Sequence, residues 1–132
     1  MKKNKSLYEG LQKDVRALKL PGIEVWENKY KDKDCTVCLE TNEFTCICPK
    51  TGLPDFAVLY IDYQPDKWCV ELKSFKLYLH SFRSVGIFHE HAANRILDDF
   101  VLASKPHRAR IRAEFNSRGG IKTIVEREYV RK

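Results

Sequence analysis

The residues best suited to chemistry are a cysteine and an aspartate on either side of a short turn. Cys48 ends a stretch rich in β-forming residues, and Asp55 follows the turn 49–54 (PKTGLP). A thiol at a strand end is held firmly yet stays accessible, and its thiolate is a nucleophile. If the turn folds back, both side chains face one cleft. Asp55 then suits proton donation better than thiol activation, because a nearby carboxylate raises a thiol pKa. A simple strand-start residue is the alternative for Asp55.

The other cysteines raise the question of a metal site. Cys35 and Cys38 have zinc-like spacing, but the Cys46-x-Cys48 step along a strand lacks the tight turn of a zinc knuckle. We therefore expect no metal, and we expect Cys35, Cys38, Cys46 and Cys69 to be small, reduced residues of the core.

Polar residues at two further points could hold a ligand. Glu71 ends a short predicted strand, where a carboxylate suits the N–H edge of a guanine-like base. His89 and Glu90 open a predicted helix and could hold a polar ligand, although a surface position that offsets the helix dipole is the alternative. Glycine-rich nucleotide loops are missing, so phosphates would need basic side chains, for which Lys73, Lys76 and Arg118 are candidates.

Hydrophobic spacing predicts the elements that position these residues. Strands are expected over 36–48, 56–63 and, more briefly, 68–72; helices over 6–18, 74–83 and 89–103; and a hairpin from 108–115 and 121–130. The strand over 56–63 is apolar on both faces, as in a strand buried on two sides. The predicted fold is α+β: an antiparallel four-stranded sheet with two helices packed on one face, in the order strand, strand, helix, helix, strand, strand.

Composition narrows the function classes. The 132 residues fit one domain, over 35–132, preceded by a partly helical or extended segment over 1–34. The net charge of +6 suggests an anionic partner. We expect a cytoplasmic protein, because we find neither a membrane-length apolar run nor a secretory signal.

Four ordered motifs resemble one enzyme family. Residues 71–78 (ELKSFKLY) look like the signature of the NADPH-dependent 7-cyano-7-deazaguanine reductases. Residues 48–57 (CPKTGLPDFA), 88–90 (FHE) and 118–121 (RGGI) resemble further segments of that family. The matches cover about three-fifths of the chain, in the family's order.

The resemblance implies a tunnelling fold of the short, single-module type, assembled into a ring-shaped homo-oligomer with active sites between subunits. It implies reduction of 7-cyano-7-deazaguanine to 7-aminomethyl-7-deazaguanine with two NADPH, in the pathway to queuosine. Cys48 would be the nucleophile that forms a thioimide and Asp55 the proton donor. The other roles would be substrate binding by Val70, Glu71, Leu72, His89 and Glu90, and cofactor binding by Lys73, Lys76 and Arg118.

Three alternatives stay open from the sequence. An amidinotransferase of the archaeosine type would act on nitrile-bearing tRNA, and arginines at 108, 110 and 112 would suit tRNA, but the 71–78 signature argues against it and direct tRNA binding is not expected. A ring-forming pterin enzyme of the same fold would also hold a guanine-like ring with a glutamate, but the Cys48–Asp55 pair and the lack of a metal ligand set argue against it. A non-catalytic basic RNA-binding module would bind RNA with a steep salt dependence.

Overall fold

The computed structural model describes residues 15–132. The predicted helix over 6–18 lies mostly outside these residues, and its described part is the 3-10 turn η2, Val15–Ala17.

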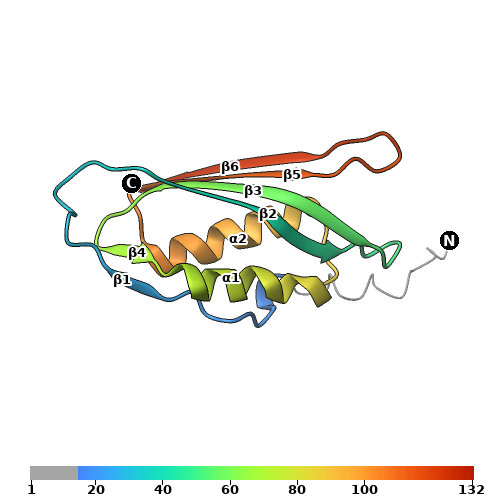
Figure 1. The fold of residues 1–132 in the computed structure, drawn as a ribbon, viewed down its shortest axis with the longest axis horizontal. Helices are drawn as coiled ribbons and strands as arrows, with labels where there is room; N and C mark the ends of the chain where they lie inside the picture. The colour runs from blue at the N-terminus through green and yellow to red at the C-terminus, as the bar shows by residue number, and fades with distance from the viewer. Residues whose placement is uncertain (1–14) are drawn as a thin grey trace.

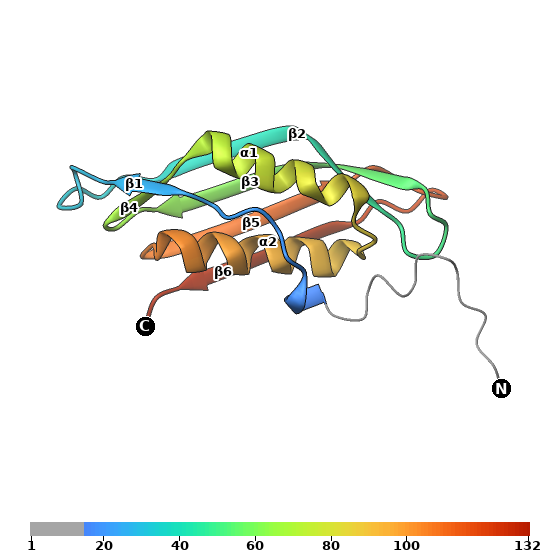
Figure 2. The same ribbon diagram turned by 90° about the horizontal axis from the view of Figure 1, so that it is seen from below.

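Four strands form one antiparallel sheet in the order β2-β3-β5-β6. They are β2 (Val37–Ile47), β3 (Pro54–Gln64), β5 (Arg108–Phe115) and β6 (Ile124–Val130). Two helices, α1 (Leu72–His80) and α2 (His89–Ser104), lie against one face of this sheet (Figures 1 and 2). A second 3-10 turn, η3 (Ser81–Ser84), follows α1. The α+β class is therefore confirmed.

Two short strands form a second sheet that the sequence did not predict. In this sheet β1 (Val25–Glu27) pairs antiparallel with β4 (Trp68–Val70). The predicted order of two strands, two helices and two strands is therefore wrong in omitting this second sheet. The short strand expected over 68–72 corresponds to β4, whereas β1 was not predicted. Over three residues an alternating pattern has too few positions to stand out, and β1 lies in a polar stretch with few apolar neighbours.

The core lies between the helices and the sheet. Each helix buries the stripe that its apolar spacing predicts, and β5 buries one side of its alternating pattern. The fully covered aromatic side chains of this layer are Phe44, Tyr78, Phe82, Phe100 and Phe115. Helix α2 ends where Lys105 takes a left-handed backbone conformation, one residue before Pro106.

The second face of β3 is open in the single chain. Ala57, Leu59 and Ile61 point to the core, whereas Phe56 on the opposite face is 51% exposed. The predicted burial of β3 on two sides therefore holds for one side within this chain, and the other side is available to an interface.

Salt bridges cover the open face of β5 and β6. Glu126 of β6 lies opposite Arg112 of β5 and accepts hydrogen bonds from both Arg110 and Arg112. Glu128, which lies opposite Arg110, forms a salt bridge with Arg108 at 3.4 Å. The arginines of β5 are thus matched by glutamates on the neighbouring strand.

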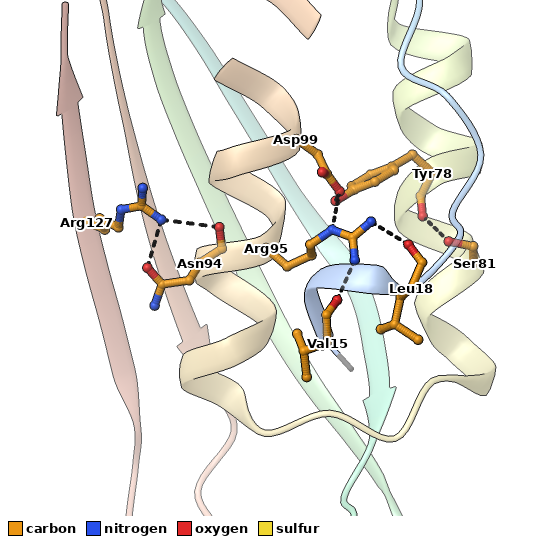
Figure 3. A network of polar contacts seen from close by, with 8 residues as sticks. All are labelled: Val15, Leu18, Tyr78, Ser81, Asn94, Arg95, Asp99 and Arg127. Atoms are coloured by element: carbon orange, nitrogen blue, oxygen red, sulfur yellow. Dashed lines mark hydrogen bonds and ion pairs between the residues drawn. The ribbon is translucent and has the colours of Figure 1, made fainter. Parts of the chain in front are cut away.

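Arg95 of α2 fixes the described part of the N-terminal segment to the helices (Figure 3). Its guanidinium donates to the carbonyl oxygens of Val15 and Leu18 and to the Asp99 carboxylate. The Tyr78 hydroxyl of α1 donates to the same carboxylate at 2.5 Å. One network therefore joins the segment, α1 and α2.

The β2–β3 turn and the β5–β6 turn lie at one end of the molecule, and the β1–β4 sheet lies at the other (Figure 1). None of the described helices is both long and apolar enough to span a membrane.

Candidate active site

The turn after β2 is closed by backbone hydrogen bonds at both of its ends. The N–H of Cys48 donates to the Leu53 carbonyl at 2.9 Å, and the N–H of Gly52 donates to the Cys48 carbonyl at 2.8 Å. Gly52 has φ = 72°, a left-handed conformation that glycine adopts without strain. Thr51 Oγ1 accepts from the N–H of Leu53 at 3.2 Å. The motif that links Cys48 to Asp55 is therefore a well-defined turn.

The Cys48 thiol lies in this turn and is partly accessible. Partial burial raises the pKa of the Cys48 thiol, but hydrogen bonds from the Thr51 hydroxyl and from the backbone N–H groups of Thr51 and Lys50 outweigh burial. The net pKa is lowered, although the nearby Asp55 carboxylate opposes the change. A lowered pKa enlarges the thiolate fraction at neutral pH, as a nucleophile requires.

Asp55 is a buried carboxylate held from two sides. It stands near the start of β3 opposite Cys46, and its side chain is 6% exposed. His89 Nε2 lies 3.0 Å from Asp55 Oδ2, and Arg118 Nε lies 3.2 Å from Asp55 Oδ1. The carboxylate is therefore fixed in orientation beside the turn that carries Cys48.

His89 reaches Asp55 because it opens α2 at the end of the molecule that carries the β2–β3 turn. Its ring stacks on Phe115 with centroids 3.7 Å apart and planes 5° from parallel. Phe115 is the last residue of β5 and is itself buried. Glu90 is the next residue of the helix and is exposed. Of the predicted ligand pair, His89 contacts the aspartate and Glu90 faces outward.

Arg118 lies in the same cluster, although the sequence suggested a phosphate site. Besides its contact with Asp55, its guanidinium donates to the Pro54 carbonyl at 2.9 Å. Arg118 precedes Gly119 and Gly120, which both have positive φ in the β5–β6 turn. This turn brings a cation to the buried carboxylate.

Glu71 lies at the opposite end of the molecule from Cys48. It follows β4, whose Val70 N–H donates to the Tyr63 hydroxyl, and Tyr63 is near the end of β3. Asp55 is at the start of β3, about 25 Å from Tyr63 at the usual rise per residue. The structure therefore does not bring the predicted substrate ligands Val70, Glu71 and Leu72 to Cys48 within one chain.

The sequence interpretation of Glu71 as a strand-end residue is wrong. Glu71 is the N-cap of α1, and its carboxylate accepts hydrogen bonds from the N–H groups of Lys73 and Ser74. Helix α1 begins at Leu72 rather than Ser74 because this cap satisfies its first donors. Each carboxylate oxygen still has acceptor capacity for a ligand.

Lys73 and Lys76 lie on the exposed side of α1, three residues apart. Lys76 borders a groove of about 360 Å³ between α1 and β2. Neither lysine is near Arg118, since α1 starts at the β4 end. The three predicted cofactor ligands therefore do not meet in one chain.

The remaining cysteines are split between core and surface. Cys46 and Cys69 are buried as expected, and burial raises the pKa of Cys46 to about 12. Cys35 and Cys38 are exposed, so the core assignment is wrong for these two. They lie where the chain enters β2, on positions that no helix covers. Within residues 15–132 no group of three or more His, Cys, Asp or Glu side chains is placed to hold a metal ion.

Sequence reasoning missed two members of the site. Thr51 was placed in a turn without a role, and Phe115 was placed at the end of the strand over 108–115 without a contact to His89. The alternation of β5 gave the direction of Phe115, but its contact with α2 depends on tertiary packing.

Comparison with known proteins decides the family. The model of the QueF-like protein family matches residues 54–132. The chain belongs to this family. The match includes Asp55, Glu71, His89 and Arg118, and starts after Cys48.

Several proteins that resemble the chain carry the same name. A protein of Elusimicrobium minutum (strain Pei191), named NADPH-dependent 7-cyano-7-deazaguanine reductase, is 52% identical over 114 residues, 86% of each chain. Proteins with the same name from Chlorobaculum tepidum and Methylobacillus flagellatus are 51% and 54% identical over 107 residues. Those matches span 81% of this chain and 92% and 77% of the two relatives.

A solved structure shares the fold. The crystal structure of the archaeosine synthase QueF-Like in the apo form matches with a TM-score of 0.66 over 70% of this chain and 91% of its own. The sequence identity is 24%, so this likeness concerns the fold alone.

Proposed function

We propose that the protein is an NADPH-dependent nitrile reductase that converts 7-cyano-7-deazaguanine to 7-aminomethyl-7-deazaguanine in queuosine biosynthesis. The observation that carries the proposal is the accessible Cys48 thiol of lowered pKa beside the buried, doubly held Asp55. The relatives named above, about half identical over most of their length, support the same substrate and reductant.

In the proposed reaction Cys48 and Asp55 divide a difficult reduction into easier steps. The thiolate adds to the nitrile carbon, so that a C–S bond forms, one C–N π bond breaks, and the nitrogen takes a proton from Asp55. The product is a thioimide, whose C=N accepts hydride more readily than a nitrile. Once the carbon is reduced, the C–S bond breaks, sulfur leaves as thiolate, and an imine remains for the second reduction.

The chain also offers groups that fit the reductant. Each NADPH, when bound, would supply one hydride, so two NADPH and two protons complete the amine. The ammonium groups of Lys73 and Lys76 project from neighbouring turns of one exposed helix side, and such a pair suits anionic phosphates. We assign them to the cofactor, and we assign Arg118 first to Asp55 because of their contact.

The separation of Glu71 from Cys48 supports a ring with sites between subunits, in the arrangement called the tunnelling fold. If Glu71 binds the deazaguanine edge, a neighbouring copy must supply Cys48. β2 and β6 are the two edge strands of the main sheet, and two different edges can pair head-to-tail around a ring. We propose that residues 35–132 form the catalytic unit of each copy. We also propose a cytoplasmic location, where NADPH is available and the five cysteines remain free thiols.

The test is oxidation of NADPH, followed by its absorbance, with 7-cyano-7-deazaguanine and the assembled protein. Wild type should turn over and form the aminomethyl product, and Cys48→Ala should not. A folded, assembled wild type without turnover would refute the reductase. A parallel reaction with nitrile-bearing tRNA and ammonia, analysed for the amidine, tests the amidinotransferase alternative.

A further inference from the structure

The Thr51 hydroxyl contacts both the backbone of the Cys48 turn and the Cys48 side chain. Its Oγ1 accepts a hydrogen bond from the Leu53 N–H, which fixes the hydroxyl oxygen beside the turn. Because that contact uses a lone pair, the hydroxyl proton stays available to donate. The acceptor it meets is the sulfur of Cys48, three residues earlier.

Backbone groups of the same turn add further hydrogen-bond donors around the Cys48 sulfur. The backbone N–H groups of Lys50 and Thr51 also face the Cys48 sulfur. Successive N–H groups converging on one point form an anion-binding nest. The turn holds this shape through the Cys48–Leu53 and Gly52–Cys48 hydrogen bonds and through the positive φ of Gly52. The result is a small pocket of donors around one sulfur atom.

These donors act against two opposing influences. Partial burial and the Asp55 carboxylate both raise the pKa of the Cys48 thiol, and the net pKa is nevertheless lowered. Arg118, the cation that contacts Asp55, is turned to Asp55 and Pro54. The influences that lower the pKa of the Cys48 thiol are therefore the hydrogen bonds from the Thr51 hydroxyl and from the backbone of Lys50 and Thr51.

We propose that the Thr51 hydroxyl is a catalytic group that stabilises the Cys48 thiolate, before the nitrile binds and again when sulfur leaves the reduced carbon. The contribution to catalysis depends on the proposed function of Cys48 as nucleophile. The contribution to thiolate stability does not depend on it, since no substrate takes part.

The experiment measures alkylation of Cys48 by iodoacetamide against pH in the full-length protein. Fragment-ion mass spectrometry assigns the modification to Cys48 among the five cysteines, and Cys48→Ala gives the background. Thr51→Val removes the hydroxyl with little change in volume, and Thr51→Ser retains it. The rate at neutral pH should fall by roughly 3–10-fold in Thr51→Val, with the profile displaced to higher pH, and should stay within about twofold of wild type in Thr51→Ser.

An unchanged alkylation profile in folded Thr51→Val would overturn the inference and would leave the reductase proposal intact. Conversely, a displaced profile in a protein without nitrile turnover would support the thiolate role and refute the reductase. If Thr51→Val does not fold, Thr51→Ala carries the same expectation, with circular dichroism as the check of folding.

Discussion

Asp55 Oδ2 lies 3.0 Å from His89 Nε2, so that a strand start and a helix start meet through one carboxylate–imidazole contact. The second oxygen of Asp55 faces Arg118 at 3.2 Å. Stacking on Phe115 prevents the His89 ring from turning away. Three segments that are distant in the sequence thus fix the orientation of the carboxylate that we propose as the proton donor, and a fixed orientation favours proton transfer.

Replacing Asp55 by Asn should separate nucleophilic attack from proton transfer. Asn retains the shape but cannot donate a carboxyl proton. We expect nitrile reduction to fall by about 10²–10⁴-fold, the usual contribution of a general acid. Alkylation of Cys48 should persist, or become faster because the opposing carboxylate is removed. Equal loss of alkylation and turnover would show that Asp55 acts on the thiol instead.

Arg118 can be assigned by comparing kinetic constants. Because its guanidinium contacts Asp55 in the free protein, Arg118→Met should lower kcat by about tenfold or more and change KM for NADPH by less than about threefold. Arg118→Lys should recover part of kcat. Lys76→Met is the matched comparison, and there KM for NADPH should rise. A large rise in KM with normal kcat in Arg118→Met would return this residue to the cofactor site.

Sites between subunits predict that two inactive variants can restore each other. Cys48→Ala retains Glu71, and Glu71→Ala retains Cys48. If these residues come from neighbouring copies, mixing the variants after dissociation and reassembly should restore part of the wild-type activity. Activity measured alongside native mass is the readout. Mixed rings that assemble yet stay inactive would place both residues in one subunit's site.

Arg95→Met should destabilise the fold without acting on the chemistry. The change removes a largely buried ion pair with Asp99 and two bonds to backbone carbonyls. We expect a loss of about 2–4 kcal/mol in the free energy of unfolding by urea. Arg83→Met, at an exposed position, should change it by less than about 0.5 kcal/mol. Similar losses in both variants would contradict the role of the Arg95 network.

Much of the fold could be predicted because its signals are local and repeated. The apolar stripes of α1 and α2 and the strict alternation of β5 each extend over two or more periods. β1 and β4 were not recognised as a pair, since each has three residues and their pairing joins distant parts of the chain. The helix-cap role of Glu71 was also missed, because glutamate is not among the residues preferred at an N-cap.

The candidate site was predictable to a different degree at each residue. Cys48 and Asp55 follow from their places around a distinctive turn. The contact of Arg118 with Asp55 depends on how the β5–β6 turn is directed over β3, which no local pattern contains. The separation of Glu71 from Cys48 follows from strand direction and became evident only once the register of β3 was known.

The salt bridges between arginines of β5 and glutamates of β6 affect the affinity of the protein for nucleic acid. Affinity for a polyanion comes largely from counterions that free cations displace from phosphates. On these two strands Arg108, Arg110 and Arg112 already have carboxylate partners. An RNA strand laid across this face would exchange one anion for another and release few counterions. Its binding should therefore be weak and almost indifferent to salt, despite a chain whose net charge is +6.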